Sequence, residues 1–365
     1  MGRGPGDVYY SEYLQLQQLL SAQQPLSGNY GPEAHDEMLF IIVHQAYELW
    51  FKQILHELRS IAAVFGSDHI DERQLTRVIA RQERVHKIQA LLLDQIDVIE
   101  TMTPMDFLDF RDLLVPASGF QSIQFKQIEI LMGLRREQRI RADRDFFESR
   151  LHPEDLQQLN QAEANPSLLD MTNRWLERMP FLRFAQFDFW EKYRSAVNAM
   201  LAADEEIVRQ NPGLNERERQ AQLAEVQATR GNFELLFDPR QFEQLQNSRQ
   251  VRFSQQAFLA AIFIFQYRDE PILYMPFRYL THLMEIDEMF TRWRSRHSLM
   301  VQRMLGTKIG TGGSSGHDYL AQTTRQNRIF VDLYHLATYI IPRSALPELP
   351  PELRQELGFH FQGQP

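Results

Sequence analysis

Residues 292–301 read RWRSRHSLMV, and residues 310–316, a short way further along the chain, read GTGGSSG. The first stretch has the spacing of a helix, and Gly306 is placed to end that helix. The helix would hold His297 rigidly, so one ring nitrogen could bind a metal. The second stretch is rich in glycine and hydroxyl groups, so it can fold closely over a small polar ligand. Together they offer a cofactor site next to a substrate site.

Each half of this pair also has a plainer interpretation. A lone helical histidine is more often a satisfied core or surface residue than a ligand, and a glycine-rich stretch is often a flexible linker. A phosphate-binding loop is excluded, because it needs a strand before it and a Gly-Lys pair at its end. Here a helix precedes the stretch and His317 follows Gly316. The dinucleotide fingerprint fails for the same lack of a strand.

The rest of the chain predicts an all-α fold. Long stretches place apolar residues at a spacing of 3.6, and almost none alternate with a period of two. The expected helices cover about 8–22, 35–65, 71–100, 104–114, 120–137, 154–162, 167–178, 183–209, 214–230, 254–268, 272–305 and 327–338.

Punctuating residues support these helix boundaries. Pro32 precedes the second expected helix, Pro116 follows the fourth, and the Asn-Pro-Gly of 211–213 separates two others. Ser118 and Gln121 have the spacing of a capping box that opens the next helix.

The composition is that of an ordinary globular protein, with 24% charged and 43% hydrophobic residues among 365. We expect one domain over 1–365, with a peripheral helical insertion at about 140–235, where Glu, Arg, Gln and Asp are frequent. A net charge of −9 disfavours a general nucleic-acid binder. The absence of cysteine excludes disulfides, thiolate metal sites and a cysteine nucleophile.

No feature of the sequence predicts export or membrane insertion. The first seven residues, MGRGPGD, contain no apolar region of a signal peptide. The longest apolar run covers 257–265, far short of the roughly 20 residues that span a bilayer. We therefore expect a cytoplasmic protein without a membrane partner.

A second informative stretch, HDEMLFIIVHQAYELWF, covers residues 35–51. Phe40, His44, Tyr47 and Phe51 follow one another at spacings of four and three, so they share one helix face. This face places one imidazole within an aromatic stripe. The plain interpretation is a buried histidine bonded to a neighbour. The functional interpretation is a histidine that hydrogen-bonds a substrate inside an apolar pocket.

A third stretch, MDFLDFRDLLVPASGFQ, covers residues 105–121. Phe107, Arg111 and Leu114 share one helix face at spacings of four and three. Arg111 either forms a salt bridge with a flanking aspartate or another helix, or presents its guanidinium fork to a ligand carboxylate.

Taken together, four ordered stretches resemble the tryptophan 2,3-dioxygenase family, from about Tyr9 to about Pro347. Several long matches in one order are far more specific than any one of them. The matching stretches are YSEYLQL at 10–16, HDEMLFIIVHQAYELWFKQ at 35–53, DFRD at 109–112 with PASGFQS at 116–122, and GTGGSSG at 310–316.

The resemblance implies an all-helical homotetramer with one haem b in each subunit and dioxygen as co-substrate. His297 looks like the proximal iron ligand, and Trp293 would pack beside it. Ser118 would lie near both the haem and the substrate. Ser295 departs from the aromatic residue expected two positions before the iron ligand.

The resemblance also implies a site for L-tryptophan. His44 would hydrogen-bond the indole N–H and orient the substrate, and Arg111 would hold the carboxylate. Tyr10 and Tyr13 resemble residues that family members contribute to a neighbouring subunit. The other residues implied to contact the substrate are Phe40, Phe107, Leu114, Ser118 and Thr311.

The implied reaction inserts both atoms of dioxygen across the indole C2–C3 bond and gives N-formylkynurenine, the first step of tryptophan catabolism by the kynurenine pathway. Three alternatives stay open. The chain could be a haem monooxygenase of the same fold acting on tryptophan or a substituted tryptophan, because small changes in shape decide between related indoles. It could also be a non-catalytic haem sensor, or a helical interaction protein without a cofactor.

Overall fold

The computed structural model describes residues 8–67, 70–71, 73–139, 151–306, 308, 320, 322–324 and 326–358. Within these ranges the predicted all-α fold is confirmed, because a single two-stranded hairpin is the only sheet. No helix in the same ranges is long and apolar enough to cross a membrane.

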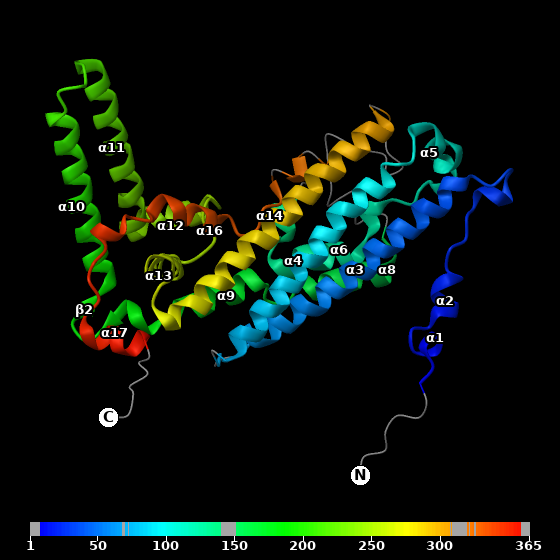
Figure 1. Cartoon of the computed structure of the whole chain (residues 1–365), viewed down its shortest axis with the longest axis horizontal. Helices are drawn as coiled ribbons and strands as arrows, with labels where there is room; N and C mark the ends of the chain where they lie inside the picture. Colours follow the sequence, from blue (N-terminus) through cyan, green and yellow to red (C-terminus); the bar gives the residue numbers. More distant parts are fainter. Residues whose placement is uncertain are drawn as a thin grey trace, which may run out of the picture.

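Three long helices lie side by side at the centre of the molecule (Figure 1): α3 (His35–Phe65), α4 (Arg73–Ile99) and α14 (Pro271–Leu305). Ile54 and Leu58 of α3 and Val85 of α4 are completely buried between them. Fully burying a side chain of this kind contributes about 1.5–3 kcal/mol, so the apolar stripes hold the three helices together.

Hydrogen bonds between the helices fix their directions. Gln82 of α4 donates from Nε2 to the carbonyl of Tyr279 at 3.2 Å, and Gln89 donates to that of Ile286 at 3.0 Å. Because both partners of the second bond lie seven residues after those of the first, α4 and α14 run in the same direction. Tyr47 of α3 donates to the Leu92 carbonyl of α4 at 2.7 Å, and Glu57, further along α3, pairs with Arg84, which is earlier on α4. Helices α3 and α4 are therefore antiparallel.

Shorter helices pack around this centre. One of them, α13, is buried on nearly all sides, as its continuous apolar sequence from 257 to 265 requires. The elements of this layer are α5 (Pro104–Arg111), η2 (Asp112–Leu114), η3 (Gly119–Gln121), α6 (Ile123–Met132), η4 (Arg136–Gln138), α8 (Pro153–Glu163), α9 (Leu168–Glu177) and α13 (Gln255–Gln266).

The boundaries of α6 differ from the predicted 120–137. Its cap is Ser122, whose Oγ accepts from the amide of Phe125 at 3.2 Å. The predicted partners Ser118 and Gln121 form one bond of a capping box, at 3.0 Å, but it belongs to η3. Gly133 ends the helix with a φ of +128°, and a Cβ there would lie 2.8 Å from Leu169 Cβ.

The stretch at 140–235, predicted to be a peripheral insertion, contains one helix that packs into the core and two that project from the body. Residues 140–150 lie outside the described ranges. Helix α9 packs into the core, where Leu168 and Thr172 are completely buried. Helices α10 (Phe189–Gln210) and α11 (Glu216–Phe237) instead form a hairpin that projects from the body (Figure 1). The single domain with a peripheral insertion stays a prediction.

Two further expected helices are present only in part. The expected helix 183–209 begins as a hairpin of β1 (Arg183–Phe184) and β2 (Phe187–Asp188), preceded by η5 (Pro180–Leu182). The expected helix 8–22 is two short helices, α1 (Tyr10–Tyr13) and α2 (Leu16–Leu20), because Gln15 adopts a left-handed φ of +52°. We call residues 8–22 the N-terminal arm; it extends away from the start of α3 (Figure 1).

The remaining elements are short, and the sequence predicts neither α12 nor α17. The expected helix 327–338 begins four residues later, because α16 and η6 together cover 331–339. These elements are η1 (Ser27–Asn29), α12 (Pro239–Asn247), α16 (Val331–His335), η6 (Leu336–Tyr339), η7 (Arg343–Ala345) and α17 (Pro351–Leu357).

Candidate active site

His44 lies on α3 with its ring against Phe40, at 4.0 Å between ring centroids. Its Nδ1 is 2.7 Å from the carbonyl of Phe40, so Nδ1 carries the proton and Nε2 is the acceptor nitrogen. Burial lowers the pKa of His44, and this outweighs the opposing effects of the Phe40 carbonyl and the Glu48 carboxylate. The imidazole is therefore neutral at pH 7. A buried histidine bonded to a neighbour, the plain interpretation, accounts for Nδ1. It does not account for Nε2, which can still accept a hydrogen bond from a ligand.

Three phenylalanine rings pack together beside His44. Phe40 lies 5.7 Å from Phe107 and 5.6 Å from Phe110, and the latter two are 5.5 Å apart. Leu114 of η2 and Met304 of α14 pack on the same cluster. Helices α3, α5 and η2 thus bring three residues predicted to contact the substrate into one apolar group: Phe40, Phe107 and Leu114.

His297 lies on α14 and stacks on Trp293, with 5.2 Å between centroids and 3° between planes. Burial, together with a smaller effect of His44, lowers the pKa of His297 to about 4. Tyr47, one turn after His44 on α3, lies 6.0 Å from Trp293, which is one turn before His297 on α14, so the two helices bring the histidines to the same region. No described residue hydrogen-bonds the His297 ring, which keeps partial solvent accessibility despite its depth.

Further aromatic residues from other helices enclose Trp293. Phe125 of α6 lies 5.1 Å from it, and Tyr47 and Phe51 of α3 lie 6.0 and 6.2 Å away. Burial raises the pKa of Tyr47 to about 12, so its hydroxyl stays protonated. The spacing of α3 predicts that Tyr47 and Phe51 share the His44 face, but nothing in the sequence links Phe125 to Trp293.

Arg111 is the last residue of α5, one turn after Phe107. Its side chain is only 15% exposed, and Nη1 lies 3.6 Å from the carboxylate of Asp112, which is 89% exposed. The predicted bridge to a flanking aspartate is thus present, but it is longer than a hydrogen bond. Thr103 and Asp106 form a capping box that fixes the start of α5 and thereby the direction of Arg111.

The remaining predicted site residues lie elsewhere. Ser118 is half-buried in the turn before η3, and Ser295 is exposed. Thr311 lies outside the described residues. Tyr10 and Tyr13 are 71% and 75% exposed on the N-terminal arm.

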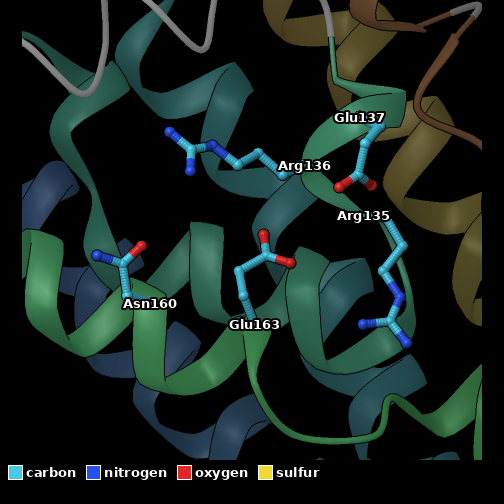
Figure 2. Close-up of a pocket in the computed structure, with 5 residues that line it drawn as sticks. All are labelled: Arg135, Arg136, Glu137, Asn160 and Glu163. Carbon is cyan, nitrogen blue, oxygen red and sulfur yellow. The ribbon is translucent and has the colours of Figure 1, made fainter.

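A cavity of about 400 Å³ between η4 and α8 contains none of these residues (Figure 2). Two of its four lining charges are paired with other residues: Arg135 binds Asp170 at 2.5 Å, and Glu163 binds Arg139. The cavity lies apart from the residues that the sequence predicts for the site.

Comparison with known proteins gives one consistent result. A family model described as tryptophan 2,3-dioxygenase matches residues 3–340. Tryptophan 2,3-dioxygenase of Alteromonas mediterranea is 51% identical over 97% of this chain and 98% of its own length. The enzyme of Bdellovibrio bacteriovorus is 47% identical over 97% and 99%, and that of Dictyostelium discoideum 43% over 96% and 88%.

The all-helical fold and these relatives define the class of protein, a dioxygenase and thus an oxidoreductase. The chain belongs to the tryptophan 2,3-dioxygenase family. The resemblance found in the sequence is confirmed.

Proposed function

We propose that the protein is a haem-dependent dioxygenase that cleaves the indole C2–C3 bond of L-tryptophan to N-formylkynurenine, as the first step of the kynurenine pathway in the cytoplasm. The observation that carries the proposal is the pair of neighbouring neutral imidazoles, His44 on α3 and His297 on α14. Membership of the family supports the substrate and the reaction.

The residues around His297 fit a haem. A neutral imidazole is the form that binds iron, and the surroundings of His297 keep it neutral. Trp293 stacks on the ring and fixes its plane. The imidazole is accessible and bonds no described residue, so its nitrogen is available to a cofactor. His297 would hold haem b, with Trp293 beside it and Ser118 near its edge; the haem supplies the dioxygen chemistry.

The protein binds and orients the substrate. Phe40, Phe107 and Leu114 would contact the indole and exclude water. Arg111, whose side chain is only 15% exposed, would hold the carboxylate, and this gives selectivity because an indole lacking that group would lose the charge-assisted bond. In this proposal Thr311 bonds the ammonium or carboxylate of the substrate.

His44 would accept the indole N–H at Nε2, because Nδ1 is committed to the Phe40 carbonyl. In this role it orients the substrate and is not an obligatory base. His44→Ala should then retain some turnover, and 1-methyltryptophan should bind poorly to the unmodified protein. Intact substrate binding with complete loss of chemistry in the variant would contradict this role.

We further propose a homotetramer in which Tyr10 and Tyr13 complete a neighbouring subunit's site. Both are exposed aromatic residues, which single chains rarely leave unburied in a group. Apolar side chains on the outer faces of the central helices support self-association; they are Ile42, Leu49, Leu91 and Val98, between 45% and 51% exposed.

The direct test uses purified, chemically reduced protein with L-tryptophan in air-saturated buffer. The proposal expects a haem-containing preparation that forms N-formylkynurenine. A colourless preparation that resists haem loading would indicate the interaction protein. A haem-containing preparation that binds L-tryptophan without product would indicate the sensor.

A further inference from the structure

Two buried charged residues lie on one face of α14 just before His297. Asp287 and Arg294 are seven residues apart, two helical turns, and are 0% and 4% exposed. The carboxylate of Asp287 accepts from the amides of Ile329 at 2.9 Å and Phe330 at 3.1 Å. It therefore fastens α14 to the chain segment before α16.

Arg294 adds two more attachments, one turn before His297. Its Nη1 donates to the carbonyl of Asn327 at 3.3 Å, and its Nη2 donates to Glu129 of α6 at 2.8 Å. The Asn327 side chain donates to the same Glu129 oxygen at 3.4 Å. Residues Asp287 and Arg294 thus hold α14 against both the 327–330 segment and α6. We call these two residues the α14 clamp.

The clamp also contacts the aromatic group around the proximal position. The guanidinium of Arg294 lies 5.8 Å from the ring centroid of Phe125. Phe125 packs on Trp293 at 5.1 Å, and Trp293 stacks on His297 at 5.2 Å. A continuous line of packed groups therefore connects the clamp to the imidazole.

The chemistry of the clamp favours a positional role over a stabilising one. A buried ion pair such as that of Arg294 with Glu129 contributes little net stability, because desolvation offsets the attraction between its charges. The hydrogen bonds of Arg294 and Asp287 are nevertheless directional. Rotating a helix by about 10° moves a side-chain tip by about 1 Å, and a functional group needs to be held within about 0.5 Å. Four directional bonds on one face oppose such a rotation.

We propose that Asp287 and Arg294 are positioning residues that fix the rotation of α14 and so the direction in which His297 is presented. This inference rests on the proposed function, in which His297 binds the haem iron. It goes beyond that function because it assigns a role to two buried residues that the proposed reaction does not use.

The structure offers a matched control for Asp287. Asp332 is equally buried, at 0% exposure, and accepts from the amides of Arg252 at 2.6 Å and Phe253 at 3.0 Å. It lies on α16 and makes no bond to α14 in the described residues. Asp287→Ala and Asp332→Ala therefore remove the same kind of carboxylate, and only the first releases α14.

The experiment compares these variants as haem-loaded, full-length proteins. The readouts are the iron–histidine stretching band of the ferrous protein by resonance Raman spectroscopy, the rate of haem loss to an acceptor protein, and thermal unfolding of the haem-free chain. We expect both alanine variants to unfold at similarly lowered temperatures. Asp287→Ala should also shift or broaden the band and speed haem loss by roughly 10- to 100-fold, and Asp332→Ala should not.

Two conservative variants keep the test decisive if an alanine variant fails to fold. Asp287→Asn retains an oxygen that can accept both amides and should restore the wild-type band. Arg294→Lys keeps the charge but loses the forked geometry, so it should show the altered band. An unchanged band in Arg294→Lys, or an equal change in Asp332→Ala, would overturn the clamp. A wild-type band that persists in His297→Ala would instead overturn the proposed function.

Discussion

Arg111 is the residue on which substrate selectivity depends in this account. Its guanidinium is largely buried at the end of α5, 3.6 Å from the exposed carboxylate of Asp112, and its planar fork matches the two oxygens of a substrate carboxylate. We expect Arg111→Ala to raise KM for L-tryptophan by about 1.5–3 kcal/mol, or roughly 10- to 150-fold, the range for hydrogen bonds to charged groups. Steady-state kinetics measure this directly.

Asp112→Ala is the control for Arg111. The exposed carboxylate of Asp112, 3.6 Å from Arg111, contributes little to holding the guanidinium. KM for L-tryptophan should therefore change by less than about twofold in Asp112→Ala. An unchanged KM in Arg111→Ala would remove this arginine from the site.

Glu129 gives a pH-dependent prediction. Burial raises its pKa, but Lys126, Arg294 and Arg139 outweigh burial and bring the pKa down to about 2. A depressed folded-state pKa contributes stability above the unfolded value of 4.5, and this stability is lost as the pH falls toward 2. Glu129→Gln should therefore destabilise the protein by about 3–5 kcal/mol at pH 7, because it leaves buried cations unpaired.

Chemical denaturation at several pH values checks this sign. The stability difference between wild type and Glu129→Gln should narrow as the pH falls from about 4.5 toward 2. A difference that is constant over this range would show that Glu129 is not ionised in the folded state.

Single residues also show what a sequence can predict. The stripe on α3 identifies His44 and Phe40, because four-residue spacing alone places them on one face. The partner of Arg294 could not be predicted in this way. Glu129 lies 165 residues earlier, and local spacing says nothing about which distant helix will supply a counter-charge.

At the scale of elements, the α4–α14 contact is joined by two buried glutamines whose Nε2 atoms donate to backbone carbonyls. The Oε1 atom of Gln89 has no described partner, so its desolvation opposes the bond that Nε2 makes. We expect Gln89→Met, which keeps the volume, to change the free energy of unfolding by less than about 1 kcal/mol.

Gln89→Ala is the matched variant, because it removes the same bond and also leaves a cavity. It should cost about 2 kcal/mol or more in denaturant unfolding. A large loss in Gln89→Met would show that the interhelical hydrogen bond itself stabilises the pair.

The sequence predicts long helices well and short breaks poorly. The limits of α3 agree at both ends with the expected 35–65, and α14 begins one residue before the expected 272. Both helices are predicted well because the same spacing of apolar residues repeats over many turns. The breaks depend on single backbone conformations. Gln15 and Ala185 adopt positive φ values of 52° and 50°, which neither residue type indicates.

At the scale of the whole molecule, the N-terminal arm tests whether the site is shared between subunits. Tyr13 is 75% exposed in the single chain, so Tyr13→Ala should change unfolding stability by less than about 0.5 kcal/mol. Activity should nevertheless fall, if the arm completes a neighbouring site.

Co-expression of Tyr13→Ala with Arg111→Ala separates action between subunits from action within one. A mixed oligomer contains subunits with an intact Arg111 next to subunits with an intact arm, so it should be more active than either variant alone. Equal inactivity of the mixture, or a fully active monomer, would contradict the shared site.

The central claim is that the protein inserts both atoms of dioxygen into L-tryptophan. The measurement that tests it most directly is mass spectrometry of the product formed by the reduced protein from L-tryptophan and isotopically labelled dioxygen. We predict a ring-opened product that carries two labelled oxygen atoms. A product with one labelled atom would contradict the claim and assign the chain to the monooxygenases.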